Sequence, residues 1–482
     1  MTLDTIVARA KRKWFVYPNS EIYWWLANTR DYGPYGSLLR KNIYDLWRKH
    51  FVQQRSDIVG MDTTILAHPT TRQASWHLEW FSDALIDDKK TGQRFRADKL
   101  IEESILQKIA RFWSEWSVQE YIIQTYWFAN LSPEARWNEW MHQYITGEKI
   151  KNPSNNKDAD WTNVRQFNLM LSTHLWPVSD DTNKIYLRPE TCQSLFTNFK
   201  NICDTTRARI PFGLAQIGKA FRNEITPWQF MYRTREFEQM EIEYFVPADP
   251  DIAAEIYDKR KQDSMEYWTQ IIGIDPSHLR FKDHDKLAHY AAAATDIEYL
   301  FPRWFGEVQG IHNRTDFDLR QHQEYSKKDM QYNDPKSWKR YIPRCIESSM
   351  GLGRQVMVAM LEFYDEEIVW EWDTRIVARF PFDLAPIKIA ILPLIDKDEM
   401  MNAESNILTR QLQKYRTVEC DGGWSIWKRY RRQDEIGTPY CITIDHQTRD
   451  DMTVTIRHRD TMLQERILMS KVVDYINAVT QK

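Results

Sequence analysis

The sequence predicts an α+β fold in which an antiparallel-sheet domain is followed by a smaller α/β domain. Its 482 residues exceed what one hydrophobic core usually serves, so two or three domains are expected. Residues 236–246 alternate between a mainly apolar face and a face with acids, which is typical of an antiparallel strand. Near Pro386 the pattern changes to a mostly apolar run, typical of a buried parallel strand. We therefore expect domains at 1–380 and 381–482.

Three further segments of the first domain are predicted from local patterns. Apolar residues recur at helical spacing over 39–51, after a Gly-Pro turn, and indicate an amphipathic helix. The polar segment 94–161 ends in a turn-rich loop and indicates an inserted helical subdomain. A second strand is expected at 185–190, with aromatic, Arg and Glu side chains on one face. Such a face can be a floor for a charged ligand, although a wetted sheet face is the commoner explanation.

The second domain is predicted from the same two periodicities. Its first strand lies within 387–395, and further strands are expected at 440–444 and 454–457. Helices are expected at 399–415 and, closing the domain, at 463–479. Alternating strands and helices of this kind indicate a small α/β unit.

Composition limits the class of protein. No run of about 18 apolar residues could cross a bilayer, and no charged-then-apolar leader begins the chain, so we expect no membrane partner and a cytoplasmic location. The five cysteines lie far apart, without a Cys-x-x-Cys pair, so neither a disulfide framework nor zinc is expected. The net charge of −3 gives no general basic bias toward nucleic acid, and the densest basic stretch is 428–432.

Two short patterns and five longer ones carry a family resemblance. Phe-Arg-Asn-Glu at 221–224, followed by 233–241, resembles motif 2 of class II aminoacyl-tRNA synthetases, and Gly-Leu-Gly-Arg at 351–354 resembles motif 3. The longer strings resemble glycyl-tRNA synthetases of the homodimeric type and lie at 186–191, 213–224, 233–243, 313–318 and 431–438. The resemblance covers nearly the whole chain. It implies a class II antiparallel-sheet catalytic domain and a C-terminal anticodon-binding domain.

The resemblance also implies an ATP site. Arg222 and Arg354 would be the catalytic residues, holding the α- and γ-phosphates, and Phe237 would stack under adenine. Arginine suits phosphate because its planar fork donates paired, charge-assisted hydrogen bonds. Magnesium would accompany ATP, with Glu307 as a candidate ligand. The implied ATP-binding set is Arg222, Asn223, Glu224, Tyr232, Arg233, Thr234, Arg235, Glu236, Phe237, Glu307, Val308, Gly351, Leu352, Gly353 and Arg354.

A site for glycine must hold the ammonium group and leave no room for a side chain. The resemblance assigns this role to Glu190, Glu241 and Glu347, with Ser349 nearby. Without the motif, an acid on a wetted strand would be the better explanation of each glutamate. The implied glycine-binding set is Arg96, Glu190, Phe237, Glu238, Gln239, Met240, Glu241, Glu347, Ser348, Ser349, Met350 and Gly351.

The implied reaction joins glycine to tRNA(Gly) at the expense of ATP, through an adenylate and without a covalent enzyme intermediate. One alternative is a synthetase for serine, proline or threonine, and the three glutamates argue against it. Another is a noncatalytic synthetase-like protein, used as an RNA-binding factor or a polymerase accessory subunit. Such proteins usually lose the phosphate-binding arginines, whereas Arg222 and Arg354 are both present.

Tryptophan is more frequent than glycine in this chain, 21 residues against 15, although glycine averages about 7% of residues in proteins. Ten tryptophans stand where the resemblance leads us to expect glycine: Trp14, Trp24, Trp25, Trp76, Trp80, Trp176, Trp228, Trp304, Trp424 and Trp427. Glycine serves where φ is positive or where another backbone approaches closely, and tryptophan fits neither place without displacement.

Three explanations of these tryptophans compete. The chain is a diverged, inactive paralogue, or an enzyme repacked around ten large side chains, or a glycine enzyme whose UGA codons were translated as tryptophan. The third is favoured because it explains the low glycine count, the high tryptophan count and the placement together. It predicts that tryptophans elsewhere, such as Trp47, are genuine.

Overall fold

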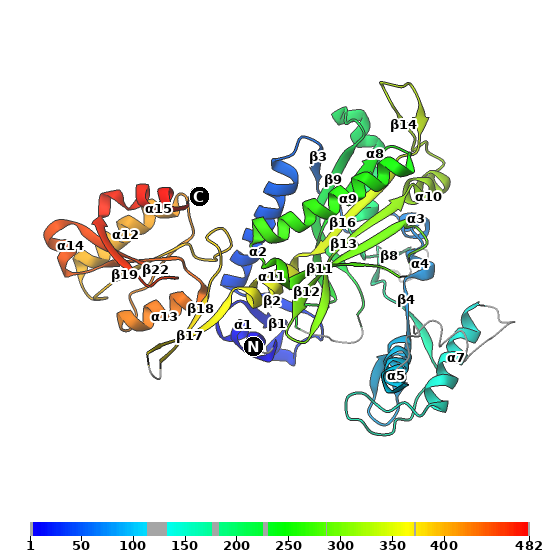
Figure 1. The fold of residues 1–482 in the computed structure, drawn as a ribbon, viewed down its shortest axis with the longest axis horizontal. Helices are drawn as coiled ribbons and strands as arrows, with labels where there is room; N and C mark the ends of the chain where they lie inside the picture. Colours follow the sequence, from blue (N-terminus) through cyan, green and yellow to red (C-terminus); the bar gives the residue numbers. More distant parts are fainter. Residues whose placement is uncertain are drawn as a thin grey trace.

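A seven-stranded sheet forms the centre of the larger body in the computed structural model of the chain (Figure 1). The structure describes residues 3–112, 133–175, 183–224, 230–285, 287–370 and 373–480. Neighbouring strands run antiparallel except β3 and β9, which are parallel. In spatial order the strands are β11 (Leu279–Asp283), β12 (Ala293–Phe301), β13 (Trp304–Thr315), β16 (Arg344–Gly351), β10 (Glu236–Val246), β9 (Phe212–Phe221) and β3 (Ile58–Met61).

One face of this sheet packs on three helices and forms the main core. Met240 and Ile242 of β10 are buried in the same cluster as Leu39 and Ile43, so the predicted apolar helix stripe faces the sheet of its own chain. The covering helices are α2 (Pro34–Arg48), which continues as a π-helical turn (Lys49–Gln53), α9 (Pro250–Glu266) and α11 (Leu352–Glu362). The predicted amphipathic helix and the strand at 236–246 are confirmed.

The opposite face of the sheet is only partly covered. Helices α8 (Cys192–Thr206) and α10 (Phe317–Ser326) pack on its outer end, in a cluster with Phe245 and Leu214. The rest of that face carries polar side chains and lines a cavity. Smaller elements beside it are β1 (Val16–Pro18), β2 (Arg30–Tyr32), α3 (Pro69–Ala74), α4 (His77–Trp80), β7 (Ser172–His174), β8 (Lys184–Tyr186), β14 (Tyr332–Asn333) and β15 (Arg340–Tyr341).

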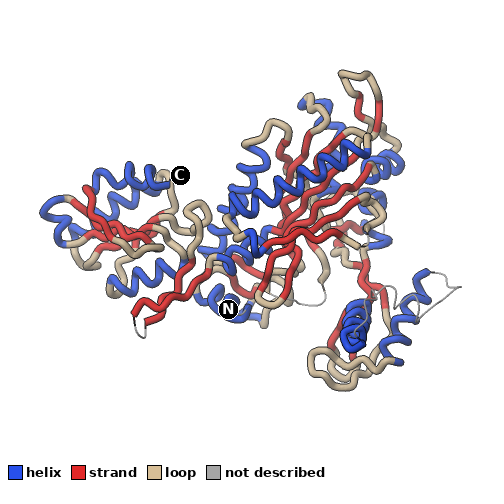
Figure 2. Tube along the Cα trace, viewed as in Figure 1, coloured by secondary structure: helices blue, strands red, loops and turns tan. Residues whose placement is uncertain are grey.

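A separate lobe projects from the sheet and has its own core (Figure 2). Its three-stranded sheet, ordered β5-β4-β6, uses strands on both sides of the expected insertion 94–161. Ile101 and Ile105 pack there against Met141 and Ile145, from a facing helix. The elements are β4 (Ser82–Asp88), β5 (Gln93–Arg96), α5 (Ala97–Phe112), α7 (Pro133–Gly147) and β6 (Arg165–Asn168).

The C-terminal part is a five-stranded α/β unit ordered β20-β19-β21-β22-β23. The predicted parallel strand is present as β19, and it pairs in parallel with β20 and β21. The predicted helix at 463–479 is wrong in its first part, because residues 464–468 pair with β22 as an edge strand. The elements are β19 (Ile389–Pro393), α12 (Glu399–Gln413), β20 (Val418–Cys420), α13 (Ile426–Ile436), β21 (Tyr440–Ile444), α14 (His446–Asp451), β22 (Thr453–His458), β23 (Gln464–Leu468) and α15 (Val472–Thr480).

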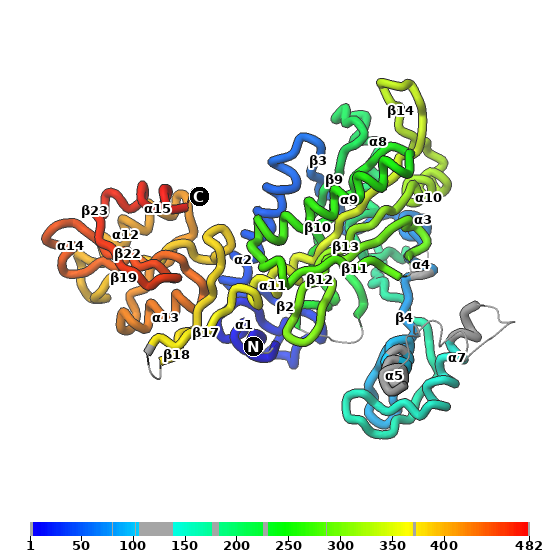
Figure 3. The backbone as a smooth tube through the Cα atoms, in the orientation of Figure 1, coloured from blue at the N-terminus to red at the C-terminus, as the bar shows by residue number. Residues whose placement is uncertain are grey.

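A hairpin and the N-terminal helix join the two bodies (Figure 3). The hairpin consists of β17 (Tyr364–Trp370) and β18 (Asp373–Ala378), and the helix is α1 (Leu3–Arg12). Lys13 forms an ion pair of 2.5 Å with Glu435 of α13. Among the described residues, no helix combines the length and the apolar character needed to cross a bilayer. The predicted α+β class is confirmed, with helices and both kinds of sheet pairing present.

Candidate active site

A cavity of about 540 Å³ opens on the polar face of the seven-stranded sheet. Its wall comes from β10, β13, β16 and the first turn of α11, with additions from the residues after β9, from α4 and from the connection before β12. Of the side chains predicted for the site, those that line the cavity are Glu190, Arg222, Glu224, Tyr232, Arg233, Thr234, Phe237, Gln239, Glu241, Glu307, Glu347, Ser349, Met350, Gly351, Gly353 and Arg354.

Strand register gathers the carboxylates at one end of the cavity. On the paired strands β10 and β16, Glu241 lies opposite Ser349, and Glu243 lies opposite Glu347. On the next strand, His312 lies opposite Glu347. Because alternate residues of a strand point to the same face, this register places all five polar side chains on the face away from the main core.

Glu241 is the centre of this carboxylate group. One of its oxygens accepts hydrogen bonds of 2.9 Å from Gln239 and Ser349, and the other accepts one of 2.9 Å from the Thr191 backbone N–H. No cation pairs with it among the described residues. Burial raises the pKa of Glu241, and the carboxylates of Glu347 and Glu190 raise it further, to about 7.

Glu347 is buried and Glu190 is half-buried, and each has a basic side chain beside it. Against the effect of burial, Arg314 and then His312 hold the pKa of Glu347 at about 2, with contacts of 2.8 and 3.0 Å. His77 Nε2 lies 3.3 Å from a Glu190 oxygen and lowers the pKa of Glu190, again against the effect of burial. These two carboxylates are therefore ionised at neutral pH.

Glu243 lies behind Glu347, fully buried. The thiol of Cys345 donates to one oxygen at 3.0 Å, and the other oxygen has no hydrogen-bond partner within the described part of the chain. Burial, followed by the charge of Glu347, raises the pKa of Glu243. Arg314 donates one hydrogen bond of 2.8 Å to Glu347 and two, of 2.8 and 2.9 Å, to Asp318. The end of the cavity thus holds more carboxylates than cations, which favours binding of a small cation such as an ammonium group.

Two arginines and an aromatic ring form the other end of the cavity. Arg222, at the end of β9, places its guanidinium 5.5 Å from the centre of the Phe237 ring and donates to the Pro189 carbonyl at 3.0 Å. Arg354, in the first turn of α11, lies 3.1 Å from a Glu307 oxygen. Guanidinium groups near an open cavity, beside a flat aromatic ring, match the needs of a nucleotide's phosphates and base.

Motif 2 brings further charged groups beside the arginines. Arg233 Nε lies 3.9 Å from a Glu224 oxygen, and the Tyr232 carbonyl accepts a hydrogen bond of 3.1 Å from Arg354. Residues 225–229 lie outside the described residues, so the predicted loop with Trp228 is not described.

The structure does not bring every predicted residue to the cavity. Glu238 bonds to Arg40 of α2 on the opposite face, and Arg96 forms ion pairs with Asp83 and Asp98 in the lobe. Alternation explains Met240, Val308 and Ser348, whose side chains are buried on the far side of the sheet. Glu236 is exposed and pairs with Lys219. The predicted residues that do not line the cavity are Arg96, Asn223, Arg235, Glu236, Glu238, Met240, Val308, Ser348 and Leu352.

Sequence reasoning missed several residues that line the cavity. His312 and Arg314 lie on the same face of β13 as Gly310. The alternation of residues along 310–314 is the sequence signal that could have found them. His77 begins the short helix α4 and Tyr290 lies in the connection before β12, and neither segment is long enough for a periodicity to mark them. The cavity therefore depends on tertiary contacts that single-sequence patterns do not report.

Five of the ten singled-out tryptophans have a left-handed backbone. Their φ angles lie between 52° and 73°, and the residues are Trp14, Trp24, Trp25, Trp76 and Trp424. Trp338, which was not singled out, shares this conformation at φ 59°. By contrast, neither Trp304 nor Trp427 has a positive φ, the side chain of Trp80 is not described, and Trp176 and Trp228 lie outside the described residues.

Trp14 shows why this backbone calls for glycine. After α1, the Phe15 N–H donates to the Ala10 carbonyl at 2.9 Å and the Trp14 N–H donates to the Lys11 carbonyl at 3.3 Å. This pair of bonds defines the Schellman helix end, whose left-handed position glycine occupies most often. Trp14 is 55% exposed, and its ring stacks on Tyr35 at a centroid distance of 5.9 Å, so its burial compensates little for the left-handed backbone.

Comparisons with known proteins match the whole chain. A family of tRNA synthetase class II core domains (G, H, P, S and T) matches residues 176–364, and an anticodon-binding domain family matches 388–479. A glycine--tRNA ligase of Alkaliphilus oremlandii is 44% identical over 99% of this chain and 98% of its own. That of Acetivibrio thermocellus is 46% identical over 98% of this chain and 97% of its own.

The fold is also found in solved structures. A prolyl-tRNA synthetase of Cryptosporidium parvum, crystallised with L-proline and AMP, aligns with a TM-score of 0.62. The alignment covers 100% of this chain and 75% of that one, at 13% identity, and it therefore supports the fold alone.

Proposed function

Because the chain belongs to the glycine--tRNA ligase family, we propose that its cavity makes glycyl-adenylate from glycine and ATP, and that glycine is then transferred to tRNA(Gly). The observation that carries this proposal is the polarity of the cavity, with carboxylates at one end and Arg222 and Arg354 at the other. A substrate with an ammonium group and a triphosphate with negative charge complement these two ends.

Glu241, Glu190 and Glu347 bind the ammonium group of glycine in this proposal. The buried Glu241 gains most, because a bound cation supplies the partner that it lacks and favours its ionised form. Ser349 and Gln239 hold the Glu241 carboxylate in place through their hydrogen bonds. Selection of glycine in this proposal requires that bound substrate leave no space for a side chain on its α-carbon.

Arg222 and Arg354 bind the α- and γ-phosphates, and Phe237 stacks under the adenine. One oxygen of the glycine carboxylate attacks the α-phosphorus, and the bond from that phosphorus to the β-phosphate bridging oxygen breaks, so pyrophosphate leaves. The arginines neutralise the charge that develops on the phosphate oxygens. The 3′-terminal ribose hydroxyl of the tRNA then attacks the activated carbonyl, and AMP leaves. The enzyme contributes positioning and electrostatics and forms no covalent bond.

Magnesium fits the phosphate end of the cavity. The Glu307 carboxylate projects beside Arg354 and is partly exposed, so one oxygen can reach a metal that phosphates and water complete. When bound, Mg²⁺ would neutralise phosphate charge and so favour the departure of pyrophosphate. The two arginines would position the triphosphate through direct contacts, and Glu307 would orient Arg354 through their ion pair.

We assign catalysis to 1–380, with the insertion at 94–161, and anticodon binding to 381–482. In support, the seven-stranded sheet ends at Gly351, and the five-stranded sheet begins at Ile389.

We propose a homodimer, supported by the family resemblance and by exposed apolar residues at Ile22, Tyr23 and Leu26. We propose cytoplasmic action, since the five cysteines are all unpaired. Light scattering of the purified chain tests the dimer, and a monomer would contradict it.

We further propose that the functional protein carries glycine where UGA codons were translated as tryptophan. The left-handed backbones at Trp14, Trp24, Trp25, Trp76 and Trp424 support this proposal. Trp338 joins the set on the same observation. The codons decide it directly, since UGA is expected at the ten singled-out positions and at Trp338, and UGG at Trp47 and Trp268. UGG throughout would overturn the proposal.

A protein-level test uses two tryptophans in different settings. Trp14→Gly should stabilise the chain by about 1 kcal/mol, because glycine adopts the left-handed helix end without strain. Trp47→Gly is the matched control and should destabilise by about 3–5 kcal/mol or more, because Trp47 is buried in the core. Urea unfolding measures both. Destabilisation by Trp14→Gly would argue that this tryptophan is native.

Glycine-dependent ATP–pyrophosphate exchange tests the activity. Two proteins are compared, the chain as printed and a version with glycine at the ten singled-out positions and at Trp338. Exchange in the glycine version alone supports both proposals. Exchange in both supports the ligase and removes the need for recoding. A folded glycine version without exchange would favour the noncatalytic alternative.

A further inference from the structure

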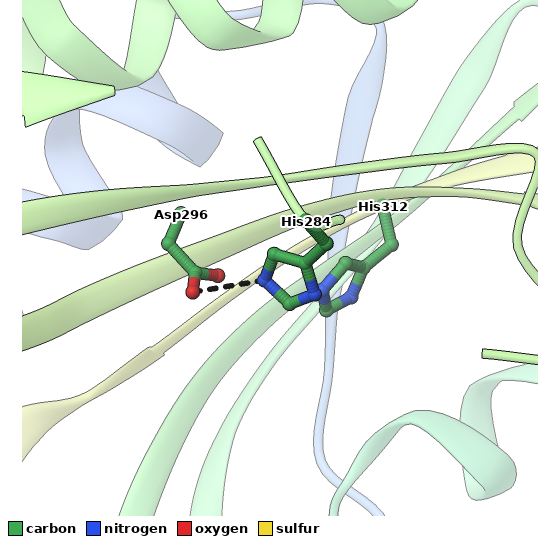
Figure 4. Close-up of side chains that lie close together, drawn as sticks. All are labelled: His284, Asp296 and His312. Carbon is green, nitrogen blue, oxygen red and sulfur yellow. Dashed lines mark ion pairs between the residues drawn. The ribbon is translucent and has the colours of Figure 1, made fainter. Parts of the chain in front are cut away.

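Three metal-ligating side chains meet beside the carboxylate end of the cavity (Figure 4). His284 follows β11, Asp296 lies on β12 and His312 lies on β13. One ligand atom of each residue lies within 4.8 Å of the others, and His284 Nε2 is 2.9 Å from an Asp296 oxygen. All three side chains are half-buried, so an ion can reach them from solvent.

His312 is oriented for a ligand. Its Nδ1 lies 3.0 Å from Glu347, whose carboxylate is fixed by Arg314, so Nε2 is the ring nitrogen left for a ligand. A carboxylate on one imidazole nitrogen is the arrangement by which proteins fix a histidine for metal binding through the other nitrogen.

Gly310 leaves space for an ion between these groups. A Cβ atom at this position would lie 3.3 Å from His312 Nε2 and 3.6 Å from an Asp296 oxygen. Both atoms thus face the same point over the sheet, and the missing side chain leaves that point open. The register explains this, because Gly310 pairs directly with Asp296 across β12 and β13.

We propose that His284, Asp296 and His312 bind a divalent transition-metal ion of the zinc type. Two imidazoles and one carboxylate match the ligands that Zn²⁺ prefers, whereas Mg²⁺ takes oxygen ligands and keeps its water. Tetrahedral Zn²⁺ holds its ligand atoms about 3.4 Å apart, so small side-chain rotations close the observed spacing. The fourth position remains for water. Cysteine spacing could not indicate this site, since no cysteine takes part.

The ion would tie the wall of the cavity to the sheet. His284 lies in the connection between β11 and β12, which also supplies His289 and Tyr290 to the cavity wall. Fixing its first residue on β12 and β13 restricts that connection. If the proposed glycine site is correct, removal of the ion should raise the KM for glycine more than it lowers kcat.

Zn²⁺ binding to the full-length protein tests the site independently of activity. Calorimetry on the metal-free protein should show one tight equivalent of Zn²⁺, retained in excess Mg²⁺. His284→Ala should weaken it at least about tenfold. His458→Ala is the matched control, because His458 forms a similar pair with Glu465 at 2.9 Å but belongs to no three-ligand group among the described residues. Co²⁺ should give the visible absorption of a tetrahedral site in the control and not in His284→Ala.

Two results would overturn the proposal. One is the absence of a tight equivalent in the unmodified protein, and the other is equal binding by His284→Ala. Asp296→Asn serves as the second variant if His284→Ala does not fold, with circular dichroism as the check, and it should weaken binding similarly. Loss of exchange activity with intact Zn²⁺ binding would count against the proposed function and leave the metal site standing.

Discussion

The C-terminal unit and the seven-stranded sheet bury charge in opposite ways. In the C-terminal unit, Asp434 is fully buried and accepts hydrogen bonds of 2.8 Å from both Arg375 and Arg457. On the seven-stranded sheet, Glu241 is equally buried but has only neutral donors, and Glu243 leaves one oxygen unpaired. Complete pairing stabilises a fold, whereas buried charge without a counter-ion is costly unless a ligand supplies one. The incompletely paired group is therefore the better candidate for binding.

The largest expected effect comes from breaking the complete pairing. Asp434→Asn leaves two buried arginines without their carboxylate and should lower the free energy of unfolding by about 3–5 kcal/mol. Urea unfolding followed by circular dichroism measures it. Asp373→Asn is the control, since Asp373 pairs with Arg431 at the surface, and it should cost at most about 1 kcal/mol. Equal losses would remove the distinction between the two pairings.

Removing the unpaired charge should affect activity and spare the fold. Glu241→Gln keeps the size of the side chain but loses the negative charge, and glycine-dependent exchange should fall about 10²-fold in whichever version of the chain supports exchange. Glu238→Gln is the control on the same strand, because its carboxylate bonds to Arg40 on the opposite face. Its exchange should change less than about threefold. A larger loss with Glu238→Gln would restore that residue to the glycine site.

The pH dependence of stability should report the raised pKa of Glu241. The pKa of Glu241 rises from an ordinary value of 4.5 to about 7 on folding, so the folded state holds a proton that the unfolded state releases. Its contribution to stability is full below about pH 4.5, is lost as the pH rises toward 7, and is constant above. Glu241→Gln should therefore stabilise the ligand-free chain more at about pH 8 than at about pH 5. If Glu241→Gln changed the free energy of unfolding by the same amount at both pH values, the raised pKa would be contradicted.

Glycine should produce the smallest of these effects. Binding of its ammonium group favours ionised Glu241, so bound glycine should raise the melting temperature more at about pH 6 or above than at about pH 5. Thermal unfolding with glycine, and with alanine as the control amino acid, measures this stabilisation. Equal stabilisation by alanine would show that the cavity does not select by size.

Much of the fold could be predicted because its periodicities are strong. Alternation located β10 at 236–246 and assigned its two faces correctly, and helical spacing located α2. The edge strand β23 was taken for helix, because five residues with mixed charge fit either period and only pairing with β22 decides. Secondary structure that depends on a partner strand cannot be read from the segment itself.

The candidate site was predicted less completely than the fold. The family resemblance implied runs of consecutive residues, whereas consecutive residues of a strand point to opposite faces of the sheet. Glu238, Met240 and Ser348 therefore point away from the cavity. The histidines that pair with the carboxylates come from α4 and β13, which are far apart in sequence. The left-handed backbones agree with five of the ten expected glycine positions. A left-handed backbone indicates a position that favours glycine even where the sequence has another residue.

The hairpin β17–β18 has a mechanical consequence for the whole molecule. Arg375 of β18 reaches Asp434 of α13 without exposure to solvent, while Tyr35 of α2 donates to Glu419 of β20 at 2.7 Å. The Tyr35–Glu419 hydrogen bond ties the C-terminal unit to the body that holds the cavity, and the Arg375–Asp434 pair fastens the hairpin to α13. Rotation of the C-terminal unit would have to break the first link or uncover the second, and buried charge that loses its partner is costly. A long ligand that contacts both bodies would then meet two surfaces already aligned, and less free energy would be spent on ordering them.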